Sequence, residues 1–161
     1  MIKRLLEFLG WGKKLPPAQP LDHPRYGSFS DDGRGLHNSV SIDWLGQPVQ
    51  FDPDALRGVI DPSSFSTMDA LLADPARWHE EVKRVVIRDC LPAWREDWRD
   101  AAGSPDLQPE DFWRRMTLEH IFAGSEGFFT FAFDADDLFG EHVVVAHGTL
   151  ENGVEEAYYE G

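Results

Sequence analysis

Three aspartates near the end of the chain are the residues whose spacing first suggests chemistry. Asp134, Asp136 and Asp137 lie together in a turn, and carboxylate oxygens are ligands that Ca²⁺ prefers. An EF-hand loop also requires glycine at its sixth position and glutamate at its twelfth. Counting from Asp134, these positions hold Phe139 and Val145. The EF-hand pattern is therefore not met, and we interpret the cluster as solvated turn acids.

The six histidines suggest a second chemistry, that of a metal-dependent hydrolase. Neither the H-E-x-x-H pattern nor a Cys/His zinc spacing is present. A metal site would have to bring together residues such as Glu119, His120 and His142 from different elements. His142 and His147 fall on one predicted strand but five positions apart, so their side chains should point to opposite faces. A small hydrolase using His142 with nearby carboxylates is the alternative function.

Motifs for nucleophilic catalysis and for nucleotide binding are absent from the sequence. Residues 124–127 form a turn and not a G-x-S-x-G elbow, and residues 33–35 lack the third glycine of a dinucleotide fingerprint. Cys90 is the single cysteine, and its apolar neighbours predict a small buried side chain. One thiol cannot form an internal disulfide, which favours a cytoplasmic location. We expect no cofactor, and we favour a protein that is not an enzyme.

The charge of the chain points to a class of partner. There are 29 acidic against 15 basic residues, a formal net charge of −14. Such a field repels phosphate backbones, so nucleic acid is not expected as a partner, and it attracts basic proteins. Solubility alone is the competing explanation. Residues 1–19 differ from the remainder in charge. They carry four basic side chains and one acidic one, a net charge of +3, so the net charge of the remaining residues is −17.

The N-terminal residues are predicted to form a separate head. Residues 1–14 resemble a short basic amphipathic helix, which is too short to span a bilayer and lacks the small-residue cleavage site of a signal peptide. Pro16, Pro17 and Pro20 then form a stiff connector. The predicted organisation is therefore a head and connector over residues 1–20 and a single α+β domain over residues 21–161. Weak membrane contact through residues 1–14 is a less favoured hypothesis.

Apolar spacing predicts the elements in the first two thirds of that domain. Residues 25–52 read as an antiparallel meander, and residues 66–73 as a short helix capped by Ser66. Asp74 and Pro75 then open a long helix, which Pro92 should kink or split. Its apolar stripe recurs every four residues, at Trp78, Val82, Val86, Cys90, Trp94 and Trp98. A further helix is expected to begin at residues 108–111 and to continue as far as Ile121.

The last third of the chain reads as three strands, over residues 128–133, 141–146 and 155–159. Asn152-Gly153 between the last two is a strong hairpin signal. The predicted fold class is α+β: an antiparallel β-sheet, built from the N-terminal meander and the C-terminal three-strand hairpins, packed on one face by two or three helices.

Acidic and aromatic residues at this end of the chain form the candidate partner-binding surface. Tyr158 and Tyr159 point to opposite faces of their strand, so one of them is expected to be exposed. Exposed aromatic side chains surrounded by acids are typical of protein interfaces, although an incidental surface ring is the simpler explanation. The candidate residues are Asp134, Asp136, Asp137, Glu141, His142, Tyr158 and Tyr159.

Several motifs together resemble a known family. They are Tyr26-Gly-x-Phe29, Ile42-Asp-Trp-Leu-Gly46, Leu107-x-Pro-Glu-Asp-Phe112, residues 128–133 and Asp137-Leu-Phe-Gly-x-His142. As a set they resemble an uncharacterised family of small bacterial proteins known only as a domain of unknown function. Glycine 140 is displaced by one position from the family pattern, so the local turn is expected to differ. The resemblance covers most of residues 25–161 and implies an α+β fold and a bacterial cytosolic origin.

The leading hypothesis is therefore a non-enzymatic, acidic protein-binding module with a basic protein as its partner. Relatives in that family look like the immunity proteins found beside secreted bacterial toxins. An immunity protein that masks a basic toxin surface is accordingly the sharpest form of the hypothesis.

Overall fold

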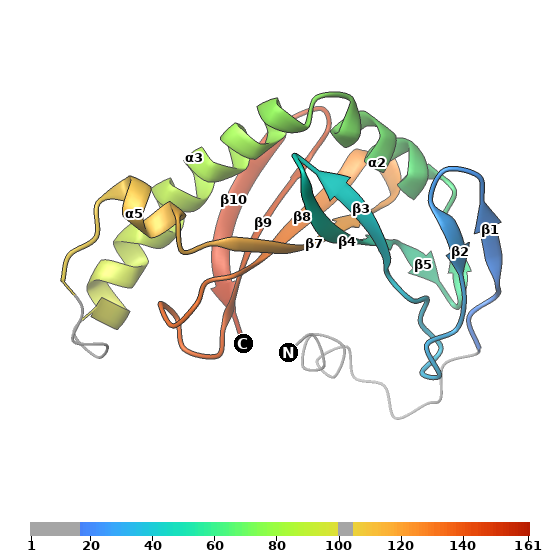
Figure 1. The fold of residues 1–161 in the computed structure, drawn as a ribbon, viewed down its shortest axis with the longest axis horizontal. Coiled ribbons are helices and arrows are strands. Elements are labelled where there is room, and N and C mark those ends of the chain that lie inside the picture. The colour runs from blue at the N-terminus through green and yellow to red at the C-terminus, as the bar shows by residue number, and fades with distance from the viewer. Residues whose placement is uncertain (1–16, 100–104) are drawn as a thin grey trace.

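The computed structural model describes residues 17–99 and 105–161 (Figure 1). The basic head predicted over residues 1–14 lies outside the described residues. The end of the connector is tied to the body, because the Ala18 amide donates to Asp31 at 2.5 Å and the Gln19 amide donates to the Gly58 carbonyl at 2.7 Å.

A six-stranded sheet of order β10-β9-β8-β7-β4-β3 forms the centre of the fold. Its strands are β3 (Val40–Trp44), β4 (Gln47–Pro53), β7 (Thr117–Ala123), β8 (Phe128–Asp134), β9 (Val143–Thr149) and β10 (Gly153–Glu160). Neighbouring strands are antiparallel except β4 and β7, which run parallel with Phe51 opposite Ile121. This parallel pair joins the N-terminal hairpin to the C-terminal strands, and the α+β class predicted from the sequence is confirmed.

Two short hairpins flank the main sheet. The strands β1 (Leu21–His23) and β2 (Gly27–Phe29) form one two-stranded sheet, and β5 (Ala55–Leu56) and β6 (Val59–Ile60) form another. The meander expected over residues 25–52 is thus divided, and only its second hairpin enters the main sheet.

The helices of the described residues pack on one face of the sheet (Figure 1). They are α2 (Ser63–Ala73), α3 (Pro75–Ala93), the π-helical segment η1 (Trp94–Trp98), α5 (Pro109–Trp113) and the 3₁₀ turn η2 (Ser125–Gly127). Asp74 caps α3 by accepting from the Arg77 amide at 3.2 Å. Pro92 does not split the helix: α3 continues to Ala93 and then widens into a single π-helical turn, the form in which π-helix mostly occurs.

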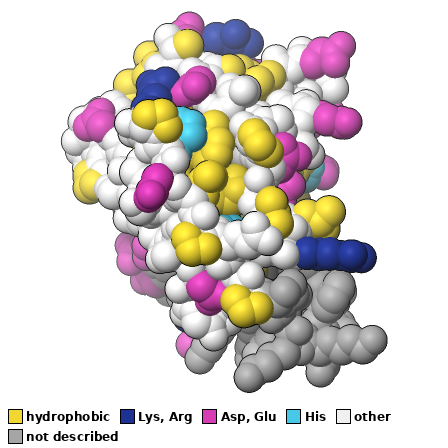
Figure 2. Space-filling model, turned by 90° about the vertical axis from the view of Figure 1, so that its right-hand side faces the viewer, with side chains coloured by type: hydrophobic (Ala, Val, Ile, Leu, Met, Phe, Trp, Pro, Cys, Tyr) yellow, Lys and Arg dark blue, Asp and Glu magenta, His cyan; other side chains and the backbone are white. Residues whose placement is uncertain are grey.

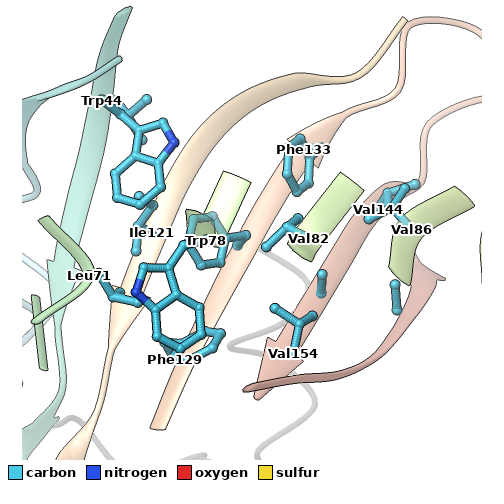
Figure 3. Close-up of a cluster of buried hydrophobic side chains, with 14 of the residues drawn as sticks. Trp44, Leu71, Trp78, Val82, Val86, Ile121, Phe129, Phe133, Val144 and Val154 are labelled. Atoms are coloured by element: carbon cyan, nitrogen blue, oxygen red, sulfur yellow. The ribbon is translucent and has the colours of Figure 1, made fainter. Parts of the chain in front are cut away.

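Apolar side chains from α3 and the sheet form the core (Figure 3). Trp78 of α3 lies edge-on against Phe129 of β8, with ring centroids 5.1 Å apart. On the other side of the core, Trp44 of β3 meets Phe131 at 5.4 Å. The stripe predicted for the long helix is buried from Trp78 through Trp94. Cys90 is buried within it, and burial raises the pKa of its thiol to about 12.

Three predictions of local structure are wrong. The short helix expected over residues 66–73 begins at Ser63, and Pro62 stands at its N-cap in place of Ser66. The helix expected to continue as far as Ile121 ends at Trp113, and residues 117–123 form β7 instead. A register shift between Leu118 and His120 breaks the alternation of apolar residues there, so that the spacing resembles that of a helix. The strand expected from Glu141 begins only at Val143, because the preceding turn is longer. His142 therefore lies in a turn and not on β9.

No helix among the described residues combines the length and the apolar character needed to cross a membrane.

Candidate functional site

The face of the sheet opposite the helices is the candidate functional surface. Within residues 17–99 and 105–161 no helix packs on it, and we call it the uncovered face. Strand register fixes which side chains lie on it, because alternate residues point to opposite faces. One row across it, from β4 to β10, is Gln50, His120, Ala132, Val145 and Tyr158. The next row is Asp52, Phe122, Thr130, His147 and Glu156. This face therefore presents polar and aromatic side chains around a small apolar centre.

The charge of these strands is of one sign. None of the residues in the six strands of the main sheet, all within the described ranges, is Lys or Arg. The acids in the same strands are Asp43, Asp52, Glu119, Asp134, Glu155, Glu156 and Glu160. Two large rings are exposed among the side chains of the uncovered face, Phe128 at 44% and Tyr158 at 43%. Acids on these strands give the face a negative potential, and exposed rings can anchor a partner.

A histidine–aspartate pair lies at the junction of the parallel strands. His120 Nδ1 of β7 lies 2.7 Å from Asp52 Oδ2 of β4, and the Ser39 hydroxyl donates to the other Asp52 oxygen. The His120 ring also stacks on Phe122, with ring centroids 5.8 Å apart. The hydrogen bond to Asp52 raises the pKa of His120 above its usual value. A carboxylate at Nδ1 fixes the orientation of the ring and leaves Nε2 for a ligand.

A second histidine–carboxylate pair lies further along the same face. His147 Nε2 of β9 is 3.1 Å from Glu156 Oε1 of β10. The rings of Phe128 and Tyr158 flank His147, with centroid distances of 6.1 and 5.8 Å. Partial burial, followed by the charges of Glu160 and Glu156, raises the pKa of the Tyr158 hydroxyl. Both exposed rings thus adjoin one histidine that is held in place by a carboxylate.

The acidic cluster predicted from the sequence is partly neutralised. The Arg115 guanidinium donates to Asp136 at 2.6 Å and also to Asp137. Asp134 is occupied locally, because it accepts from the Asp136 amide at 2.8 Å. Glu141 is exposed in the same turn. The cluster is therefore a hydrogen-bonded turn with a bound cationic side chain, and not a free acidic patch.

His142 and Tyr159 face the helix side of the sheet. His142 Nδ1 bonds the Phe139 carbonyl oxygen at 3.0 Å, and its ring lies 5.1 Å from that of Trp98. Tyr159 stacks on Phe139 with centroids 5.0 Å apart. Tyr158 is the tyrosine on the uncovered face, as its register opposite Val145 requires. The structure therefore does not gather the seven predicted residues on one surface.

The three residues considered for a hydrolase are also separated. His120 lies on the uncovered face, whereas His142 packs against Trp98 on the helix side. Glu119 is the extra residue at the β7 register shift and is exposed. Within residues 17–99 and 105–161, no group of three or more His, Cys, Asp or Glu side chains is placed to hold a metal ion.

Sequence reasoning missed Asp52, Phe122 and Phe128 as residues of the candidate surface. One signal was available, since the segments that form the sheet lack Lys and Arg. This signal does not identify β7, because the apolar spacing up to Ile121 favours a helix. On a helix, His120 and Phe122 would not share a face.

A family model described as "Uncharacterized protein conserved in bacteria (DUF2262)" matches residues 27–158. No curated protein matches, and no solved structure does. Because the matched range spans most of the chain and nearly all of the main sheet, the chain belongs to this uncharacterised bacterial family.

Proposed function

We propose that this family member is a non-enzymatic protein-binding module that holds a basic protein on the uncovered face of its sheet. The observation that carries the proposal is the one-sided charge of that sheet: its six strands, all in the described part of the chain, contain acids and no Lys or Arg. The exposed rings of Phe128 and Tyr158 on the same face supply apolar contact area.

The uncovered face supports this proposal better than the Asp134–His142 turn does. Arg115 already offsets the charge of Asp136 and Asp137, and the rings of His142 and Tyr159 are used in packing. Of the residues first considered, Tyr158 is the anchor in this proposal. Asp134 and Glu141 are exposed and contribute to the negative potential at the rim.

The two kinds of residue play different roles in binding. Aromatic side chains that become fully buried supply most of the affinity at interfaces. Acids around them speed the encounter with a basic partner, and this effect weakens as salt screens the charges. The proposal therefore requires an association rate that falls with salt and a dissociation rate that depends on the rings.

Immunity against a toxin is the more specific form of the proposal. The net charge of −14 motivates this form, because a negative potential attracts a basic surface. In this form the chain acts in the cytoplasm and covers a basic surface of the toxin. Co-expression with a toxin encoded by the neighbouring gene should restore growth, whereas toxicity unchanged by co-expression would rule this form out.

Affinity capture followed by kinetics tests the general proposal. The purified chain is first used to capture basic proteins from its host. The affinity and binding rates of the captured protein are then measured with the wild type and with the double variant Phe128→Ser, Tyr158→Ser. The matched control is Leu56→Ser, because Leu56 is 76% exposed but lies on β5, outside the main sheet. We expect the double variant alone to weaken binding by about tenfold or more. Equal affinities for all three proteins would contradict the proposal.

The alternative, a metal-dependent hydrolase using His142, has a separate test. It requires stoichiometric metal in the purified protein and an activity that His142→Ala abolishes. Because the His142 ring contacts Trp98 and Tyr159, this variant needs a check of folding before any loss of activity is assigned to chemistry.

A further inference from the structure

The two edges of the main sheet differ in how their backbone groups are satisfied. At the β10 edge, side chains of α3 bond the strand directly. Glu81 accepts from the Val154 amide at 3.1 Å, Asp89 accepts from the Ala157 amide at 3.0 Å, and Arg88 donates to the Glu155 carbonyl at 2.9 Å. This edge is therefore closed to a further strand, which is one way in which proteins protect sheet edges.

In the described part of the chain, no side chain bonds the backbone of the β3 edge in this way. β3 and β4 are joined by the two-residue loop Leu45-Gly46, whose φ angles of 54° and 82° fit a type I′ turn. In such a hairpin Trp44 and Gln47 form a hydrogen-bonded pair, and such pairs alternate along the ladder with pairs that are not hydrogen-bonded. Asp43 and Ser41 belong to the second kind, so their backbone N–H and C=O groups point away from β4. Pro48 opposite Asp43 agrees with this pattern, since it has no N–H to donate. No described residue bonds those outward backbone groups.

A hollow of about 590 Å³ lies beside this edge. The residues that line it include Ser41, Ile42 and Asp43 of β3, and Arg25, Tyr26 and Leu72 from other elements. The far wall is held in place, because Asp69 accepts from both the Arg25 guanidinium at 2.5 Å and the Tyr26 hydroxyl at 2.6 Å. Figure 2 views the molecule from the side on which β1 and β2 lie, where hydrophobic side chains gather with acidic and basic ones around them.

We propose that an extended segment of the basic partner adds to the β3 edge as a further strand of the main sheet. The inference rests on the proposed function and specifies how the partner is held. The outward N–H and C=O groups of Ser41 and Asp43 recognise an extended backbone, and the hollow gives space for side chains. Alternate residues of the segment meet the apolar Ile42 and Leu72 on the helix side and Asp43 on the uncovered face. The segment therefore alternates apolar and basic residues.

A second copy of this chain fits the edge less well. Pairing two β3 edges would bring the Asp43 side chains of two molecules close together, and each chain carries a net charge of −14. Like charges opposite one another destabilise strand pairing, whereas a lysine opposite Asp43 favours it. Charge complementarity therefore selects a basic segment over self-association.

Amide hydrogen exchange with a defined probe tests the inference. The probe is a capped synthetic peptide of alternating lysine and valine, and its matched control carries N-methyl groups on alternate backbone nitrogens. We expect the first peptide to slow exchange of the Ser41 and Asp43 amides by about tenfold or more, and the N-methylated peptide to have no such effect. Asp43→Asn should weaken peptide binding while keeping the protection pattern, because it removes the charge and keeps the backbone N–H.

Three outcomes would overturn the inference. If peptide binding slows amide exchange only near Phe128 and Tyr158, strand addition at β3 is rejected and the proposed function is kept. Protection of Ser41 and Asp43 without peptide, together with a dimer in sedimentation, would assign the edge to a second copy. If the peptide does not bind, strand addition is also rejected. The proposed function is then decided separately, by the affinity of the captured partner for the Phe128→Ser, Tyr158→Ser variant.

Discussion

His120 Nδ1 lies 2.7 Å from Asp52 Oδ2, across the parallel pair that joins the two halves of the main sheet. On the opposite side of the same pair, Phe51 and Ile121 are fully buried. The junction is therefore apolar toward the helices and polar toward the uncovered face. Within the described residues, the hydrogen bond between the ionisable side chains of β4 and β7 thus lies on the face where we expect the partner to bind.

Asp52→Asn should lower the pKa of His120. The ordinary value for histidine is about 6.5, and the hydrogen bond to Asp52 raises the folded-state pKa of His120 above it. Stability from a raised pKa is fully present below the unfolded-state pKa and is lost as pH rises through the folded-state value. The substitution should therefore cost more free energy of unfolding in mildly acidic than in mildly alkaline solution.

The measurements for this variant are an NMR titration of the His120 ring and denaturant unfolding at both pH values. Asp43→Asn is the matched control, because Asp43 lies on the same face and is exposed. An unchanged His120 titration in Asp52→Asn would refute this account of the pair.

Replacing Tyr158 and Tyr159 by alanine should lower the free energy of unfolding by very different amounts. Tyr159 packs on Phe139 and Trp98, so Tyr159→Ala should lower the free energy of unfolding by about 2–3 kcal/mol. Tyr158 is 43% exposed, and Tyr158→Ala should cost less than about 1 kcal/mol while weakening partner binding. Urea unfolding of the two neighbouring variants makes the comparison, and equal losses would show that both rings are structural.

Asp89→Ala should open the β10 edge. The substitution leaves the Ala157 amide without its acceptor, and an unsatisfied polar group costs about 1–3 kcal/mol when it stays buried. We expect a lower free energy of unfolding and faster exchange of the Ala157 amide. Glu80→Ala, at an exposed position of the same helix, is the control that should change neither.

Arg115→Gln should strengthen binding of a basic partner without unfolding the turn. The ion pairs of Arg115 with Asp136 and Asp137 lie near the surface, so their loss should change the free energy of unfolding by less than about 1 kcal/mol. Freeing two carboxylates makes the potential more negative and should raise the association rate at low salt. Surface plasmon resonance at two salt concentrations checks this, and a slower association would contradict it.

Local patterns in the sequence were sufficient for several elements. Asn152-Gly153 places the last hairpin, and the four-residue spacing from Trp78 to Trp94 places the buried side of α3. Asp74 begins that helix as an N-cap should. Each of these features is decided by residues close together in the chain, which is why the sequence alone predicts them.

Long-range contacts decided the rest. Nothing near residues 117–123 indicates that they pair in parallel with β4, more than sixty residues earlier in the chain. Likewise, the period of two predicts that Tyr158 and Tyr159 point apart, but the position of α3 and η1 determines which of them packs against the core. Arg115 reduces the free charge of the acidic turn from a loop 21 residues away from Asp136, and no local motif signals that pairing.

Site-specific photo-crosslinking in a lysate of the host cell tests the central claim most directly. A photoreactive phenylalanine analogue is placed at Phe128 or Tyr158 on the uncovered face, and at Arg84, an exposed position of α3, as the control. We expect both positions on the uncovered face to capture the same basic protein, less efficiently as salt is raised, and Arg84 to capture none of it. Equal capture at Arg84, or a partner that is not basic, would contradict the account.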